Sequence, residues 1–126
     1  MKFLIPLLIL ILLLIVAACS EAQTISSAPA NGDIPINGEQ IFVSYCSPCH
    51  GPTGEGIAGL GKPLNSSDFV AGLSDAELLA FIKTGRPVDD PLNTSGVAMP
   101  PKGGNPALTD EQLQAIVAHL RSIHIP

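Results

Sequence analysis

The chain has 126 residues, a formal net charge of −5 at pH 7 and 46% hydrophobic residues, which is enough for one small domain. Its acidic balance argues against nucleic-acid binding, and the sequence contains no Gly-rich phosphate loop.

The first residues predict a targeting segment. Lys2 precedes an uninterrupted apolar run over residues 3–18. As a helix, this run would reach roughly 24 Å, which is short of the ~30 Å hydrocarbon core of a bilayer. Such a length favours an export signal over a permanent membrane span.

The apolar run ends in Val16-Ala17-Ala18-Cys19, which resembles the box that precedes the acylated cysteine of bacterial lipoproteins. We therefore expect a lipoprotein signal peptide at residues 1–18 and lipidation at Cys19. The domain would then be exported and membrane-anchored, on the periplasmic or another extracytoplasmic face. An uncleaved signal anchor with a buried free thiol is the alternative.

A linker is predicted between the leader and the folded part of the chain. Residues 19–36 are rich in Ser, Ala, Pro, Asn and Gly and show no apolar period, so we expect the acylated cysteine to be followed by flexible chain. A linker of this length has an end-to-end distance of roughly 20–25 Å. The folded domain is predicted at residues 37–126.

A first helix is predicted over residues 38–45, where Ile41, Phe42 and Tyr45 recur at helical spacing. The motif that follows ends this helix and carries the most specific signal in the chain.

This motif, Cys46-Ser47-Pro48-Cys49-His50, reads C-x-x-C-H, the attachment site of a c-type haem. The two thiols form thioether bonds with the haem, and the adjacent histidine becomes an axial ligand of the iron. C-x-x-C alone also occurs in redox dithiols and as half of a zinc site. A redox dithiol expects a parallel sheet and a zinc site needs two more ligands, and the third cysteine lies in the leader. The sequence therefore predicts one covalently bound haem c.

The next segments are a loop and a well-marked helix. Residues 51–65 are rich in Gly and Pro and predict a loop, followed by a short helical turn around Phe69. Ser74 and Glu77 form a capping box at the start of a middle helix. Gly85 is its expected C-terminal stop.

Residues 86–105 are irregular and contain four prolines. A loop of this length in a small domain indicates a function, and it carries Met99. Because Met1 is the initiator, Met99 is the only methionine that the mature protein could offer to the iron. His50 and Met99 are therefore the predicted metal ligands.

A last helix is predicted over residues 110–123, where Thr109 and Gln112 form a second capping box. No segment shows convincing strand alternation, so the predicted fold class is all-α.

This pattern of helices, motif and loops resembles a class I cytochrome c over nearly all of residues 37–123. The resemblance implies a small fold of three to four helices around one covalent haem. The motifs that carry it are Cys46-Ser47-Pro48-Cys49-His50-Gly51, Ile82-Lys83-Thr84-Gly85-Arg86-Pro87, Met99-Pro100-Pro101 and Leu108-Thr109-Asp110-Glu111-Gln112-Leu113 with Val117-Ala118-His119-Leu120.

The resemblance also implies two finer features. The first and last helices should cross closely at Gly38 and Phe42, with His119 where an aromatic residue is usual; His119 as an alternative iron ligand stays open. A proline carbonyl should accept the N–H of the proximal imidazole, and Pro63 is the best match, although it could also be an ordinary loop proline.

Two protein ligands leave the iron no open position, which suits electron transfer better than oxygen activation. The expected function is a membrane-tethered monohaem cytochrome that passes single electrons to redox partner proteins in a respiratory or photosynthetic chain, and not an enzyme. One alternative is a fixed haem subunit of a larger membrane oxidoreductase, since the layout resembles the monohaem lipoprotein subunits of alternative complex III. The other is a haem enzyme with a labile sixth ligand.

Overall fold

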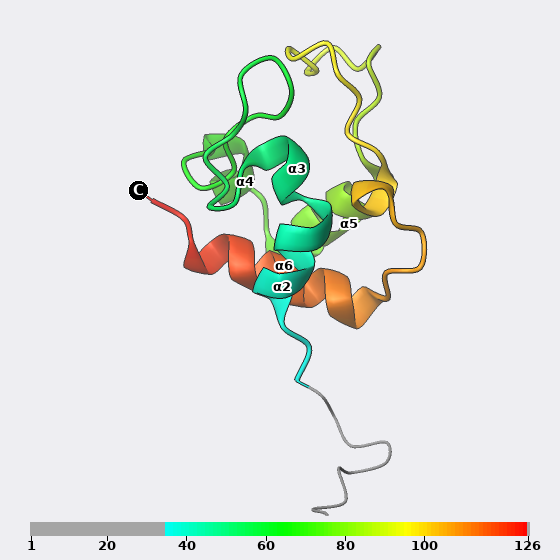
Figure 1. The fold of residues 1–126 in the computed structure, drawn as a ribbon. Helices are drawn as coiled ribbons and strands as arrows, with labels where there is room; N and C mark the ends of the chain where they lie inside the picture. Colours follow the sequence, from blue (N-terminus) through cyan, green and yellow to red (C-terminus); the bar gives the residue numbers. More distant parts are fainter. Residues whose placement is uncertain (1–34, 126) are drawn as a thin grey trace, which may run out of the picture. The chain divides into compact units, whose positions relative to one another are not determined.

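The computed structural model describes residues 35–125, which form five α-helices and one 3₁₀ turn (Figure 1). No strand occurs in this part of the chain, where the only β-pairing is two isolated bridges, so the all-α prediction is confirmed. The elements are α2 (Gly38–Tyr45), α3 (Ser47–His50), α4 (Asp68–Gly72), α5 (Asp75–Thr84), η1 (Pro101–Gly104) and α6 (Asp110–Ser122).

The predicted signal peptide at 1–18, the lipidation site Cys19 and nearly all of the predicted linker lie outside the described residues. Within residues 35–125, none of the helices has the length and apolar character needed to cross a membrane.

Local capping explains where the longer helices begin. Asn37 accepts a hydrogen bond from the backbone N–H of Gln40 at the start of α2. The two predicted capping boxes are both formed, at Ser74 for α5 and at Thr109 for α6. Each box satisfies N–H groups that the first helical turn leaves without an intrahelical partner.

The haem motif is itself helical, which the sequence did not predict. The chain breaks at Cys46 and then forms the single turn α3, with Pro48 in its first positions. Proline has no N–H to donate to the preceding turn and is tolerated only near a helix start. The break therefore separates α2 from α3.

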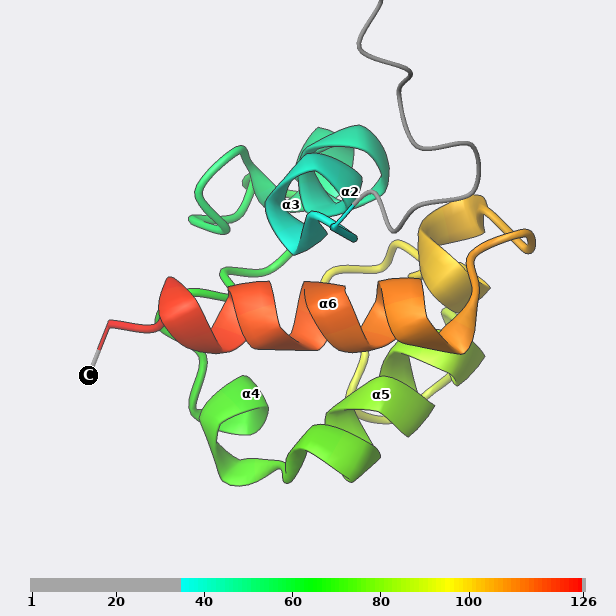
Figure 2. The same cartoon turned by 90° about the horizontal axis from the view of Figure 1, so that it is seen from below.

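Helix α6 is central to the packing. Figure 2 shows it running between α2 and α3 on one side and α4 and α5 on the other. The side chains that form the buried core are Phe42, Val70, Leu78, Ile82, Leu108, Leu113, Ile116, Val117 and Leu120.

Helices α2 and α6 cross at van der Waals contact. A Cβ atom on Gly38 would overlap the carbonyl oxygen of Ala115, so only glycine allows this approach. One turn further along, the ring of Phe42 packs against that of His119 with 5.1 Å between centroids. His119 thus lies at the crossing, at the position where the class I resemblance expects an aromatic residue.

Arg121 connects α6 to the region of α4 and α5. Its guanidinium donates to the carbonyl oxygens of Val70 (2.6 Å) and Leu73 (2.5 Å) and to the Asp75 carboxylate (2.9 Å). A short helix such as α4 leaves its C-terminal carbonyls without intrahelical donors. Arg121 supplies donors to that end and holds the short helix against the core.

Candidate haem-binding site

A cavity of about 450 Å³ reaches into the core of the domain, and the five predicted cofactor-binding residues all line it. They are Cys46, Cys49, His50, Pro63 and Met99. Figure 1 shows the loop that follows α3 and the loop that leads to η1 reaching the same end of the domain. Buried side chains of α2, α5 and α6 form part of the wall, so the cavity is mainly apolar.

Cys46 and Cys49 are not joined by a disulfide. Burial raises the pKa of the Cys46 thiol to about 11, and the nearby Cys49 sulfur raises it further in the same direction. A redox-active thiol has a pKa below its ordinary value, whereas the pKa of Cys46 is shifted the other way. This environment disfavours the redox-dithiol interpretation at Cys46.

The zinc interpretation lacks further ligands. Among residues 35–125, no group of three or more His, Cys, Asp or Glu side chains is placed to hold a metal ion.

The ring of His50 is oriented by the loop that follows it. Its Nδ1 atom lies 2.8 Å from the carbonyl oxygen of Lys62. A carbonyl can only accept, so Nδ1 carries the proton and Nε2 keeps the lone pair that a metal ligand requires. Gly61 allows the loop this close, because a Cβ there would overlap the carbonyl oxygen of Cys49.

The expectation that the Pro63 carbonyl accepts this hydrogen bond is wrong: the acceptor is Lys62, one residue earlier. Proline restricts the residue before it to extended conformations, so Pro63 limits the directions that the Lys62 carbonyl can take. Pro63 itself lines the cavity. The sequence signal for the close approach of this loop to His50 is Gly61-Lys62-Pro63, in which one residue separates a glycine from a proline.

Met99 is held by an unexpected pairing with Arg86. The Arg86 N–H donates to the Met99 carbonyl (2.9 Å), and the Met99 N–H donates to the Arg86 carbonyl (2.8 Å). This isolated antiparallel bridge places Met99 next to the end of α5. Gly85 makes the pairing possible, because a Cβ there would overlap the Met99 carbonyl oxygen.

The side chain of Arg86 also lines the cavity. Its guanidinium lies 4.8 Å from the ring centroids of both Phe69 and Phe81, and its Nε atom lies 3.6 Å from a carboxylate oxygen of Asp90. This separation is longer than a hydrogen bond, and the buried Nε has no hydrogen-bond partner in the described part of the chain. A cation with an unused donor thus faces the cavity region.

His119 is not among the residues that line the cavity. Its ring lies at the crossing of α2 and α6, and its buried Nε2 has no hydrogen-bond partner among residues 35–125. The geometry therefore favours a packing role for His119 over iron ligation.

An all-α domain in which C-x-x-C-H and a distant methionine line one apolar cavity defines a cytochrome c domain. The comparison with family models agrees. Residues 35–120 match the family described as cytochrome C oxidase, cbb3-type, subunit III, and the chain belongs to this family.

Comparison with curated proteins gives one relative in the same family. The chain is 30% identical over 105 residues to the Cbb3-type cytochrome c oxidase subunit CcoP of Rhodobacter capsulatus. This alignment covers 79% of the chain and 32% of that protein, so the chain spans about a third of the length of its relative. No solved structure matches the chain.

Membership of this family confirms the predicted cofactor, one covalently bound haem c. It also supports an electron-transfer role at the level of the family.

Proposed function

We propose that Cys46 and Cys49 form the two thioether bonds and that His50 and Met99 are the axial ligands of the iron. The observation that supports this most strongly is that His50 and Met99 line the same cavity although 49 positions separate them in the sequence. Each is held in place by backbone atoms of another segment, His50 by the Lys62 carbonyl and Met99 by the bridge to Arg86.

Haem c supplies one-electron chemistry at its iron when it is bound. The chain's own residues then orient the two axial ligands and exclude water with the apolar wall. The thioether of Met99 favours the reduced iron and raises the potential, because axial-ligand identity sets much of the potential of haem proteins. Arg86 lines the cavity as a cation and is suited to hold a haem propionate.

With His50 and Met99 as ligands, no coordination position is left for a substrate. The proposed function is therefore single-electron transfer, in a domain tethered to a membrane by acylated Cys19 and the linker at 19–36. A tether of this kind raises the local concentration of a redox partner without holding the domain in one pose.

A second candidate function is favoured by the family comparison. The matched relative is named as a subunit of a cbb3-type cytochrome c oxidase, so the chain could be a fixed haem subunit of a larger membrane oxidoreductase. The resemblance of the chain's layout to the monohaem lipoprotein subunits of alternative complex III supports the same kind of role, a fixed subunit of a membrane complex. Purification in mild detergent separates these roles: a carrier is recovered alone, and a subunit is recovered with stoichiometric partners.

The ligand assignment is tested with Met99→Ala in the holoprotein. We expect three changes in this variant. The far-red absorption that a methionine sulfur ligand gives to ferric haem should be lost, cyanide should bind readily, and the midpoint potential should be lower. His119→Ala is the control, because His119 lies outside the cavity wall, and it should keep the wild-type spectrum. If Met99→Ala keeps its spectrum and potential while His119→Ala changes both, the ligands are two histidines. Cyanide binding to the wild type as fast as to Met99→Ala would instead favour a haem enzyme with a labile ligand.

A further inference from the structure

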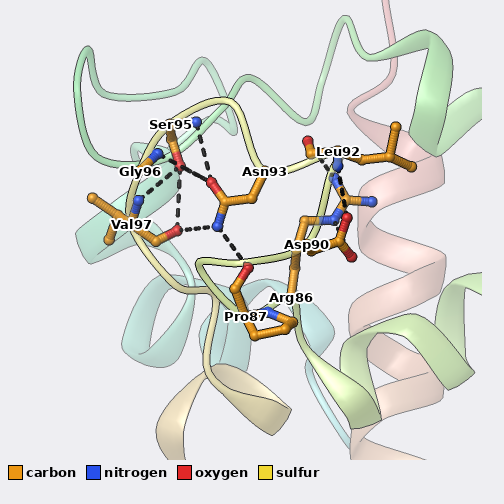
Figure 3. Close-up of polar contacts among 8 residues, drawn as sticks. All are labelled: Arg86, Pro87, Asp90, Leu92, Asn93, Ser95, Gly96 and Val97. Carbon is orange, nitrogen blue, oxygen red and sulfur yellow. Dashed lines mark hydrogen bonds and ion pairs between the residues drawn. The ribbon is translucent and has the colours of Figure 1, made fainter.

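The loop between Arg86 and Met99 is organised around one side chain, that of Asn93 (Figure 3). Its Nδ2 group donates to the carbonyl oxygens of Pro87 and Val97, each at 2.9 Å. Its Oδ1 atom accepts from the N–H and hydroxyl of Ser95 and from the N–H of Gly96, at 3.1–3.2 Å. One amide therefore satisfies backbone groups from both ends of the loop.

The need for this amide follows from the bridge between Arg86 and Met99. Beyond the bridge, the two chain segments present the carbonyl oxygens of Pro87 and Val97 to the same point. Two acceptors cannot bond to each other, and Pro87 has no N–H of its own to continue the ladder. The two hydrogens of a primary amide meet both acceptors at once, so Asn93 takes the place of the missing backbone pairing.

The amide orientation is defined by its partners. The two carbonyls can only accept and the N–H groups of Ser95 and Gly96 can only donate, so the nitrogen must face Pro87 and Val97. Aspartate would keep the acceptor side and lose both donors.

The loop is held by polar contacts and not by burial in the core. No residue from 87 to 98 belongs to the buried core, and the apolar side chains of Leu92 and Val97 are 62% and 37% exposed. Its order therefore depends on polar contacts, and the Asn93 side chain makes five of them, more than any other side chain of the loop. Val97 stands two residues before Met99, so freedom at Val97 is transmitted directly to the proposed ligand.

We infer that Asn93 is a positioning residue that fixes the Met99 segment through the Pro87 and Val97 carbonyls and thereby keeps the sixth ligand on the iron. The inference rests on the proposed ligation by Met99. An external ligand can bind only while Met99 is away from the iron, so its association rate reports how often the segment opens. Each hydrogen bond shifts such an equilibrium by roughly twofold to tenfold, and the loss of two predicts roughly tenfold faster binding or more.

The test measures imidazole binding to the ferric holoprotein, because this probe is largely neutral near pH 8 and is insensitive to a new charge. Asn93→Ala and Asn93→Asp should both bind imidazole roughly tenfold faster or more. In both variants the far-red band from Met99 ligation should weaken and the midpoint potential should fall. Asn93→Asp retains the acceptor bonds to Ser95 and Gly96, so it preserves the turn if Asn93→Ala folds poorly.

Asn65→Ala is the matched control. Asn65 also donates its amide across a loop, to the Thr53 carbonyl at 3.0 Å, and its other hydrogen bonds within residues 35–125 are to Gly54 and Ile125, away from the Met99 segment in the sequence. It should bind imidazole at the wild-type rate.

The inference is overturned if the Asn93 variants bind imidazole at the wild-type rate, or if Asn65→Ala accelerates binding as much as they do. Failure of the proposed function has a different signature. If Met99 is not an iron ligand, Met99→Ala leaves the far-red absorption of the wild type unchanged. The inference about Asn93 then fails together with the proposed function.

Discussion

Gly85 provides the sharpest test of how the Met99 segment is held. It follows α5 with φ 73° and ψ −162°, a backbone region that is essentially restricted to glycine. A Cβ at this position would overlap the Met99 carbonyl oxygen and lie 2.9 Å from backbone atoms of Pro100 and Pro101. Gly85→Ala therefore adds a backbone cost and a steric cost at the same residue.

The two costs have separate magnitudes. Holding alanine in this backbone region costs about 1–3 kcal/mol. Forcing an extra methyl group against backbone atoms costs about 1–3 kcal/mol more. The expected loss is about 2–6 kcal/mol, a large part of the ~5–15 kcal/mol that stabilises an ordinary domain. Part of the loss should appear as movement of Met99, because the atom displaced is its own carbonyl oxygen.

Gly59→Ala is the control that separates these costs. Gly59 has the same φ, 73°, but a Cβ on it would have no atom within 4 Å. It should lose only a backbone part, about 1–3 kcal/mol.

Urea unfolding of the holoproteins gives both free energies, and imidazole binding gives the opening of the Met99 segment. We expect Gly85→Ala to be less stable than Gly59→Ala and to bind imidazole faster. Equal stability and equal binding rates in the two variants would show that the contact between Gly85 and Met99 does not constrain the ligand, and the reasoning would be refuted.

Three further predictions concern attachment, packing and anchoring. Covalent haem should remain on the denatured wild-type chain in a haem-stained gel and should be lost from the double variant Cys46→Ser/Cys49→Ser; stain lost from the wild type would contradict thioether attachment. Arg121→Met should lower the free energy of unfolding by about 3–6 kcal/mol, since it removes two hydrogen bonds from a charged group to the Val70 and Leu73 carbonyls and each such bond contributes about 1.5–3 kcal/mol; urea unfolding would contradict this with a loss below ~1 kcal/mol. Intact mass of the mature protein should begin at Cys19 with added acyl mass, whereas a mass that retains Met1 would indicate an uncleaved anchor.

The sequence alone was sufficient for features that depend on neighbouring residues. The capping boxes at Ser74 and Thr109 each act within three residues, and both helices begin where these boxes predict. C-x-x-C-H acts within one turn of chain, so its cofactor could be predicted without any knowledge of the fold. Met99 was predicted as the second ligand by elimination, and that prediction required no geometry either.

Only the tertiary structure decided how these local features are held. The direction of a backbone carbonyl depends on the path of a whole loop, so the partner of His50 is Lys62 and not Pro63. The bridge between Arg86 and Met99 and the three hydrogen bonds of Arg121 join segments that are not adjacent in the chain. Such contacts leave no periodic or local signal in the sequence, because a donor and an acceptor from separate segments meet only after the helices have packed.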